Sequence, residues 1–177
     1  MDPIVAAVDL SGQVALVTGA SSGLGRRFAA LLAANGARVV ATARRVDRLE
    51  ELAEEIGTAG GSCLPLALDV TDAEQIASVA ARAEAEVGPV QILVNNAGIP
   101  DAQYATRMPV ELVDQVLDTN LRAPFLLSCE VARRLIDLQL PGRIVNISSV
   151  GGFHYAGGGA ALYSISKAGV NRLTEAL

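Results

Sequence analysis

The sequence predicts an α/β fold: a doubly wound parallel sheet covered by helices on both faces, in three layers. Short apolar runs alternate along the chain with helical patterns at the spacing of βαβ units, which require parallel strands. A glycine-rich turn within residues 14–25 joins the first run to the first helical pattern. Pro65 lies inside the third run, and proline cannot donate to a central ladder, so we expect that strand at a sheet edge. This placement fits the strand order 3-2-1-4-5.

The expected strands and helices alternate without exception. The strands cover 13–18, 37–42, 63–68, 90–94 and 143–147, and the helices cover 25–35, 46–56, 71–87, 109–138 and a last segment from 159–162 to Leu177. Right-handed crossovers put the helices on both faces and leave the carboxyl ends of the strands at one ligand-binding edge. We find no internal repeat and no linker, so we expect a single domain over 1–177.

Turn and capping residues mark the helix boundaries. The first helix stops at Asn35-Gly36 and the second stops before Gly57, because glycine and asparagine favour the conformation that ends a helix. Residues 71–74, Thr-Asp-Ala-Glu, are typical of a helix start, and that helix stops before Gly88-Pro89. Pro109 opens the long fourth helix, since proline is well suited to a first turn.

Composition and charge exclude several classes of function. Hydrophobic residues make up 51% of the 177 residues, which indicates a globular protein. No apolar run approaches the roughly 18 residues of a membrane helix, and the first ten residues lack the basic start of a secretory signal. The net charge is −5 and no basic cluster exceeds Arg44-Arg45. We therefore expect a cytoplasmic protein with neither nucleic acid nor membrane as a partner.

Cysteine and histidine usage points away from metal binding. Cys63 and Cys129 each lie in an apolar run, so we expect two buried thiols and no disulfide. His154 is the only histidine, which argues against a histidine-based metal site and against a His-dependent triad. We expect no metal site.

The glycine-rich stretch 18–25, Thr-Gly-Ala-Ser-Ser-Gly-Leu-Gly, is a candidate phosphate site. Gly19, Gly23 and Gly25 stand where the backbone must bend and approach another group closely. The first amides of the following helix lack internal partners and carry partial positive charge, which suits a pyrophosphate. The spacing is G-x-x-x-G-x-G rather than G-x-G-x-x-G, so a plain tight turn remains an alternative.

The end of the second expected strand indicates which dinucleotide would bind. An acidic residue about 20 positions after the glycine loop binds the adenosine ribose, whereas an arginine accommodates a 2′-phosphate. Here Ala43 and Arg44 occupy that place and no carboxylate does, which favours NADP while leaving NAD possible. The alternative is that Arg44 and Arg45 are solvated residues at a helix start. Asp69, after the third strand, is expected to cap or to contact adenine.

Tyr163 and Lys167 are the candidate proton-transfer pair. They are four residues apart in a helical pattern, so their side chains leave one face of the helix. A nearby ammonium favours a phenolate, and a phenol tuned in this way can exchange a proton with a carbonyl or an alcohol. A surface pair without a role is the alternative, but the pair follows a strand end bearing Ser148-Ser149, where this architecture binds ligands.

Asn120 and Pro124 predict an interruption of the fourth helix. Pro124 has no N–H, so the carbonyl of Asn120 loses its usual donor four residues later and the helix is expected to kink. A freed carbonyl in a cleft can hold an ordered water, and we expect the Asn120 carbonyl to do so.

Together these motifs resemble the short-chain dehydrogenase/reductase family, in its branch with a single Rossmann domain. The resemblance is carried in family order by residues 18–25, Asp69-Val70, Asn-Asn-Ala-Gly at 95–98, Asn120, Ile-Val-Asn-Ile-Ser-Ser at 144–149 and Tyr-Ser-Ile-Ser-Lys at 163–167.

The resemblance implies a catalytic tetrad of Asn120, Ser149, Tyr163 and Lys167. Tyr163 would be the general acid in carbonyl reduction, and Lys167 would hold the nicotinamide ribose and lower the pKa of the phenol. Ser149, chosen over Ser148 by its place in the motif, would bind the substrate oxygen. Asn120 would position a water that joins Lys167 to solvent.

The resemblance also implies the cofactor site and the reaction. The cofactor-binding residues would be Gly19, Ser21, Ser22, Gly23, Leu24, Gly25, Arg44, Asp69, Val70, Asn96, Ala97, Gly98, Tyr163 and Lys167. The reaction would be reversible hydride transfer between NADP(H) and a small-molecule carbonyl or secondary alcohol. A homodimer or homotetramer would be expected. The alternatives are a non-catalytic nucleotide-binding sensor or scaffold on the same fold, or an inactive truncated form.

Members of the family run longer than this chain, adding strands and helices after the tyrosine helix. The sequence stops inside that helix, so the C-terminal strands are absent from it. We expect the domain to be incomplete at this end, and the sequence to be part of a longer protein.

Overall fold

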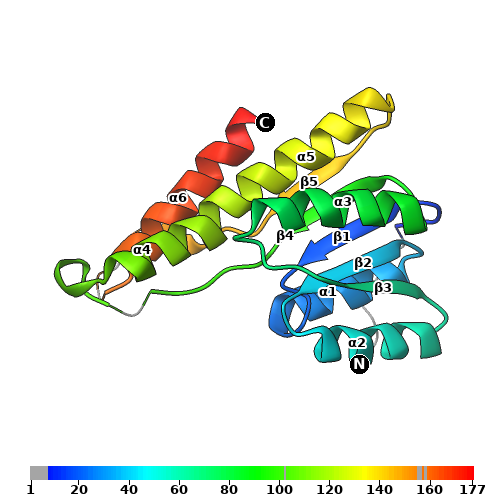
Figure 1. The fold of residues 1–177 in the computed structure, drawn as a ribbon, viewed down its shortest axis with the longest axis horizontal. Coiled ribbons are helices and arrows are strands. Elements are labelled where there is room, and N and C mark those ends of the chain that lie inside the picture. Colours follow the sequence, from blue (N-terminus) through cyan, green and yellow to red (C-terminus); the bar gives the residue numbers. More distant parts are fainter. Residues whose placement is uncertain (1–7, 102, 155–156, 158) are drawn as a thin grey trace.

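The computed structural model describes residues 8–101, 103–154, 157 and 159–177, and its centre is a five-stranded parallel sheet (Figure 1). The strands are β1 (Val14–Thr18), β2 (Arg38–Ala43), β3 (Ser62–Ala67), β4 (Val90–Asn95) and β5 (Arg143–Asn146). They lie in the order β3-β2-β1-β4-β5, which confirms the predicted sheet and the edge position of the strand that contains Pro65.

Helices cover both faces of the sheet because side chains alternate along each strand. From β1, Ala15 and Val17 pack in one core with α1 (Gly23–Ala34) and α2 (Val46–Thr58). Val14 and Leu16 point the other way, into a second core with α3 (Ala73–Val87) and α5 (Ala123–Asp137). These three layers match the predicted architecture.

The segment predicted as one helix over 109–138 consists of three parts. After a 3-10 turn at Ala105–Arg107, α4 (Val110–Leu117) leads into a π-helical turn at Asp118–Arg122, which leads into α5. Pro124 cannot donate to Asn120, and the amide of Ala123 bonds the carbonyl of Asp118, five residues back. The predicted interruption therefore takes the form of a widened turn.

The last helix, α6 (Ala161–Ala176), lies alongside α4 and the π-helical turn (Figure 1). It also contacts the 3-10 turn Val150–Gly152, which follows β5 at the sheet edge. Among the described residues, no helix combines the length and the apolar character that crossing a bilayer requires.

The two cysteines differ from each other. Cys63 on β3 is half-buried against the α1/α2 core, and this burial raises the pKa of its thiol to about 11. Cys129 is exposed, so the prediction that it is buried is wrong. It lies on α5, whose inner face carries Leu127 and Val131, and neighbouring helix positions do not share a face.

Candidate functional site

The glycine-rich stretch forms a tight loop between β1 and α1. Gly19 and Gly23 have φ of 67° and 55°, conformations that side chains disfavour. Gly25 is needed for another reason, because a methyl group there would meet the carbonyl of Gly19 and lie 2.5 Å from Asn96 Nδ2. The loop therefore depends on close backbone approach at its start and at its end.

The loop after β4 holds the glycine loop in place. Thr18 Oγ1 accepts hydrogen bonds from the amides of Asn96 and Ala97, each at 3.0 Å. Asn96 Nδ2 donates to the carbonyl of Thr18 at 2.9 Å. The two loops at the carboxyl edge thus form one unit, and Thr18 is a residue that sequence reasoning missed.

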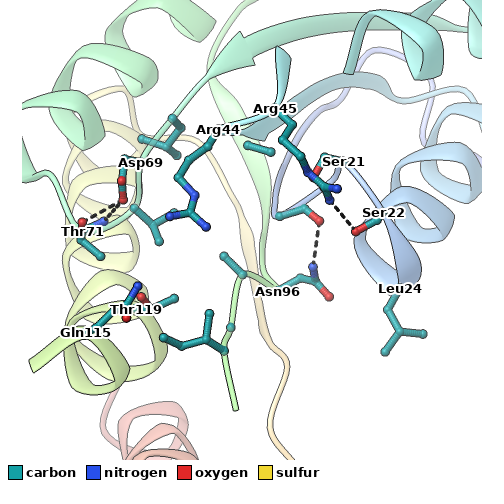
Figure 2. Close-up of a pocket in the computed structure, with 17 residues that line it drawn as sticks. Ser21, Ser22, Leu24, Arg44, Arg45, Asp69, Thr71, Asn96, Gln115 and Thr119 are labelled. Atoms are coloured by element: carbon teal, nitrogen blue, oxygen red, sulfur yellow. Dashed lines mark hydrogen bonds between the residues drawn. The ribbon is translucent and has the colours of Figure 1, made fainter. Parts of the chain in front are cut away.

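An elongated cleft of about 520 Å³ runs along this edge of the sheet (Figure 2). The predicted cofactor-binding residues that line it are Gly19, Ser21, Ser22, Leu24, Arg44, Asp69, Val70, Asn96, Ala97 and Gly98. Gln115 of α4 and Thr119 of the π-helical turn form part of its wall (Figure 2). No sequence pattern indicated these two, because their approach to the cleft depends on how α4 packs.

Two arginines give the cleft a positive mouth. Arg44 extends into the cleft, whereas Arg45 Nη2 donates to Ser21 Oγ and Ser22 Oγ at 3.0 and 2.9 Å (Figure 2). Neither arginine forms an ion pair within the described residues. Asp69 pairs with neither of them, and its carboxylate accepts from the amide and hydroxyl of Thr71 at 3.0 and 2.8 Å.

Lys167 lies on α6 and does not itself line the cleft. Its side chain is buried, and Nζ donates to the carbonyl of Ile147, just after β5, at 2.7 Å. Burial lowers the pKa of Lys167. Nζ lies 5.7 Å from the centre of the Tyr163 ring, so the two side chains share one helix face as their spacing predicts.

Asn120 joins this end of the site to the loop after β4. Its Oδ1 accepts from the amide of Ile99, and its Nδ2 donates to the carbonyl of Ile99, both at 2.9 Å. Nδ2 also donates to Ser166 Oγ on α6 at 3.2 Å. A methyl group built on Gly98 would lie 3.4 Å from Asn120 Oδ1 and 3.6 Å from Lys167 Nζ. The cleft-lining loop therefore passes directly beside Asn120 and Lys167.

The two serines after β5 have different surroundings. Ser148 Oγ donates to the carbonyl of Lys167 at 3.2 Å, which attaches it to α6. Ser149 Oγ accepts from the amide of Gly151 at 3.1 Å. A methyl group built on Gly151 would contact both Ser149 Oγ and the Tyr163 ring, at 3.5 and 3.9 Å. Ser149 and Tyr163 thus flank the same glycine.

This geometry places the tyrosine helix and the glycine loop at the same edge of the sheet, joined through residues 96–99. The family model for short chain dehydrogenases matches residues 13–177, the region that contains the whole site. The chain belongs to the short-chain dehydrogenase family.

Its similarity to known members of this oxidoreductase family is substantial. The 3-oxoacyl-acyl-carrier-protein reductase FabG of Escherichia coli is 40% identical over 170 residues, which cover 96% of this chain and 68% of that protein. A short-chain type dehydrogenase/reductase from Mycobacterium marinum superposes with a TM-score of 0.91 at 38% identity, over 95% of this chain and 66% of that one. The chain spans about two thirds of the length of both relatives.

A second solved structure is a metagenomic short-chain oxidoreductase in complex with NADP. It superposes with a TM-score of 0.89 at 40% identity, over 94% of this chain and 75% of that one. Within the described part of this short-chain dehydrogenase, no three His, Cys, Asp or Glu side chains are grouped so that they could share a metal ion.

The contact between Gly25 and Asn96 predicts a stability effect. We expect Gly25→Ala to lower the free energy of unfolding by about 1–3 kcal/mol, because the added methyl must displace backbone or break the Asn96 bond. Urea unfolding measures this. Gly57→Ala is the matched control, since Gly57 lies in α2 with nothing within 4 Å of the added methyl. Equal effects of the two substitutions would contradict the proposed contact.

Burial of Lys167 predicts a pH dependence. Its pKa in the folded chain is below the ordinary 10.5, so between these two values the unfolded chain binds the proton that the folded chain has lost. The free energy of unfolding must therefore rise with pH in that window. We expect the stability of the parent relative to Lys167→Met to increase from neutral pH toward 10.5 in urea titrations. A difference independent of pH would show that the ammonium is not desolvated.

Proposed function

We propose that this chain binds NADP(H) along the cleft and catalyses reversible hydride transfer to a small-molecule carbonyl or from a secondary alcohol. The observation that carries the proposal is the position of Lys167 Nζ beside Gly98 of the loop that lines the cleft, with the centre of the Tyr163 ring 5.7 Å from that nitrogen. FabG relatives are named as reductases of a 3-oxoacyl group, which is a carbonyl substrate.

The residues of the cleft fit a dinucleotide. The closely packed loop at Gly19 and Gly25 leads into the N-terminal end of α1, whose unpaired amides suit the pyrophosphate. Arg44 extends into the cleft without a carboxylate partner among the described residues, and a guanidinium matches a 2′-phosphate in charge and geometry. These features favour NADP over NAD.

When bound in the cleft, NADP(H) would supply or accept the hydride, and residues of the chain transfer the proton. Tyr163 donates its phenolic proton to the carbonyl oxygen, and Ser149 donates a hydrogen bond to that same oxygen. Lys167 places a positive charge 5.7 Å from the centre of the phenol ring.

Asn120 takes part in the same reaction through its main-chain carbonyl, which binds a water. Its side-chain amide is already occupied by Ile99 and Ser166. The carbonyl cannot receive the usual bond from position 124, where proline has no N–H, and we assign to it a water that returns protons toward Lys167. A nucleotide-binding scaffold without catalysis has no use for the buried cation at Lys167, so we favour the enzyme.

We further propose that the protein forms a homodimer or homotetramer through the outer faces of α4 and α5. Val110 on α4, and Phe125 and Ile136 on α5, are exposed apolar side chains, at 69%, 50% and 73%. Exposed apolar side chains on these two helices favour burial against a second copy.

The decisive experiment tests the phenol. In the full chain, we expect NADPH oxidation on a panel of aldehydes, ketones and 3-oxoacyl thioesters, and we expect Tyr163→Phe to lower kcat by about 10²–10⁴-fold by removing the proton donor. Tyr104→Phe is the matched control, because Tyr104 is exposed and each of the two substitutions removes one phenolic hydroxyl group. Full activity of the Tyr163→Phe variant would remove the proposed acid.

Arg44 is tested separately through cofactor choice. We expect Arg44→Ala to lower the ratio of kcat/KM for NADPH to that for NADH by about 10- to 100-fold, as for loss of one charge-assisted phosphate contact. Arg82→Ala removes an arginine on α3 that pairs with Glu86, away from the cleft, and should leave the ratio unchanged. A parent enzyme that prefers NADH would overturn the role given to Arg44.

A further inference from the structure

The first turn of α6 lacks a cap of its own. Its N-cap residue is Ala160, which has no polar side chain, and the first backbone bond runs from Ser164 to the carbonyl of Ala160. Helix starts leave such amides unpaired unless another group accepts from them. Here the carboxylate of Asp101 does so, since Oδ2 accepts from the amide of Leu162 at 2.9 Å across 61 residues of sequence.

Capping α6 with the Asp101 carboxylate requires that carboxylate to be buried. Its side chain is 4% exposed, and Oδ1 has no hydrogen-bond partner among the residues the structure describes. Nor does Asp101 form an ion pair within that same part of the chain. Burying a carboxylate with one unpaired oxygen costs free energy, whereas a serine or threonine at position 160 would cap the turn locally at lower cost. Stability alone therefore does not account for this contact.

The contact links the start of α6 to the loop after β4, because Asp101 lies in that loop. It lies at the end of the loop that Thr18 holds at Asn96 and Ala97 and that Asn120 holds at Ile99. The same loop lines the cleft. Through Asp101, the start of α6 is thus attached to the segment that is packed on the glycine loop.

A second contact joins the same two segments. Gly159, just before α6, has a φ of 84°, and a methyl group there would lie 3.3 Å from the carbonyl of Gln103. The chain ahead of α6 and the chain after Asp101 therefore pass at backbone distance. The Asp101 carboxylate supplies the directional bond within this contact.

We propose that Asp101 is a positioning residue that sets the place of Tyr163 relative to the cofactor cleft. The proposal rests on the proposed function. Leu162, which bonds Asp101, immediately precedes Tyr163. One turn later, Lys167 Nζ bonds the carbonyl of Ile147. Tyr163 thus lies between two hydrogen-bonded residues, Leu162 bonded to the loop after β4 and Lys167 bonded to the end of β5. Loss of the Asp101 bond leaves the N-terminal turn of α6, which carries Tyr163, free to shift.

The kinetic test compares Asp101→Ala with Asp101→Asn in the full chain. We expect Asp101→Ala to lower kcat about 10- to 100-fold through displacement of the phenol, with KM for NADPH within about twofold of the parent. Asp101→Asn keeps an acceptor of the same shape for the Leu162 amide, so we expect it to restore kcat to within about fivefold. Arg134→Ala is the control for general destabilisation, because it breaks the ion pair with Glu84 that joins α5 to α3 and the ion pair with Glu130 within α5.

Two kinetic results would overturn the proposal: an unchanged kcat in Asp101→Ala, or an equal loss of kcat in Arg134→Ala at matched thermal stability. A loss confined to KM would also overturn it, since a displaced phenol acts on the chemical step. Should Asp101→Ala fail to fold, the hydrogen-exchange comparison of Asp101→Asn with the parent carries the test.

Hydrogen exchange separates this proposal from the proposed function. In Asp101→Asn we expect amide exchange across 162–166 to be about 3- to 30-fold faster, because a neutral acceptor binds the Leu162 amide more weakly than a carboxylate does. Exchange in α3 should be unchanged. If Asp101→Asn exchanges faster at 162–166 than the parent, but the parent reduces no carbonyl, the proposed function is refuted while the link between Asp101 and α6 is supported. Unchanged exchange at 162–166 in Asp101→Asn would refute the positioning role of Asp101, whatever the activity of the parent.

Discussion

The whole site depends on the close contact between the loop after β1 and the loop after β4. Thr18 Oγ1 accepts from two consecutive amides of the second loop, and Gly25 lies so near Asn96 that no side chain fits between them. Adjacent parallel strands bring their carboxyl ends together, but only these contacts make the two ends a single surface. The end of the site formed by the glycine loop and the end that bears the tyrosine are both built on that surface.

Buried polar side chains form hydrogen bonds that hold the helices in place relative to the strand ends. Asn120 is fully buried and uses its amide to bond Ile99 and Ser166, which places the π-helical turn against α6. Asn95 Nδ2 similarly donates to Ser128 Oγ on α5 and to Asn146 Oδ1 on β5. Each such bond is directional and costs free energy when broken in a buried place. The helices are therefore held in register with the strand ends as well as packed on the sheet.

The fold and much of the cleft could be predicted from local sequence signals. Pro65 predicted the edge strand, and the glycines of the first loop predicted a close backbone approach, because each of these residues acts through its own backbone. Tyr163 and Lys167 could be placed on one face by spacing alone.

What the sequence did not show depends on packing between distant segments. Cys129 is exposed although it lies in an apolar run, because helix geometry turns that position outward. Arg45 bonds Ser21 and Ser22 while Arg44 extends into the cleft, and two consecutive arginines carry no signal that separates these roles. Thr18, Gln115 and Asp101 were missed because their partners or neighbours lie far along the chain.

The widened turn at Asp118–Arg122 also determines which way the two flanking helices face. An α-helix rotates about 100° per residue, so one additional residue in a turn rotates everything after it by that angle. Upstream, Gln115 borders the cleft; downstream, Leu127 and Val131 are buried in the sheet core. Without the additional residue, the face that α5 presents would be rotated by about 100° relative to α4. The widened turn thus determines which face α5 turns toward the sheet while α4 forms a wall of the cleft.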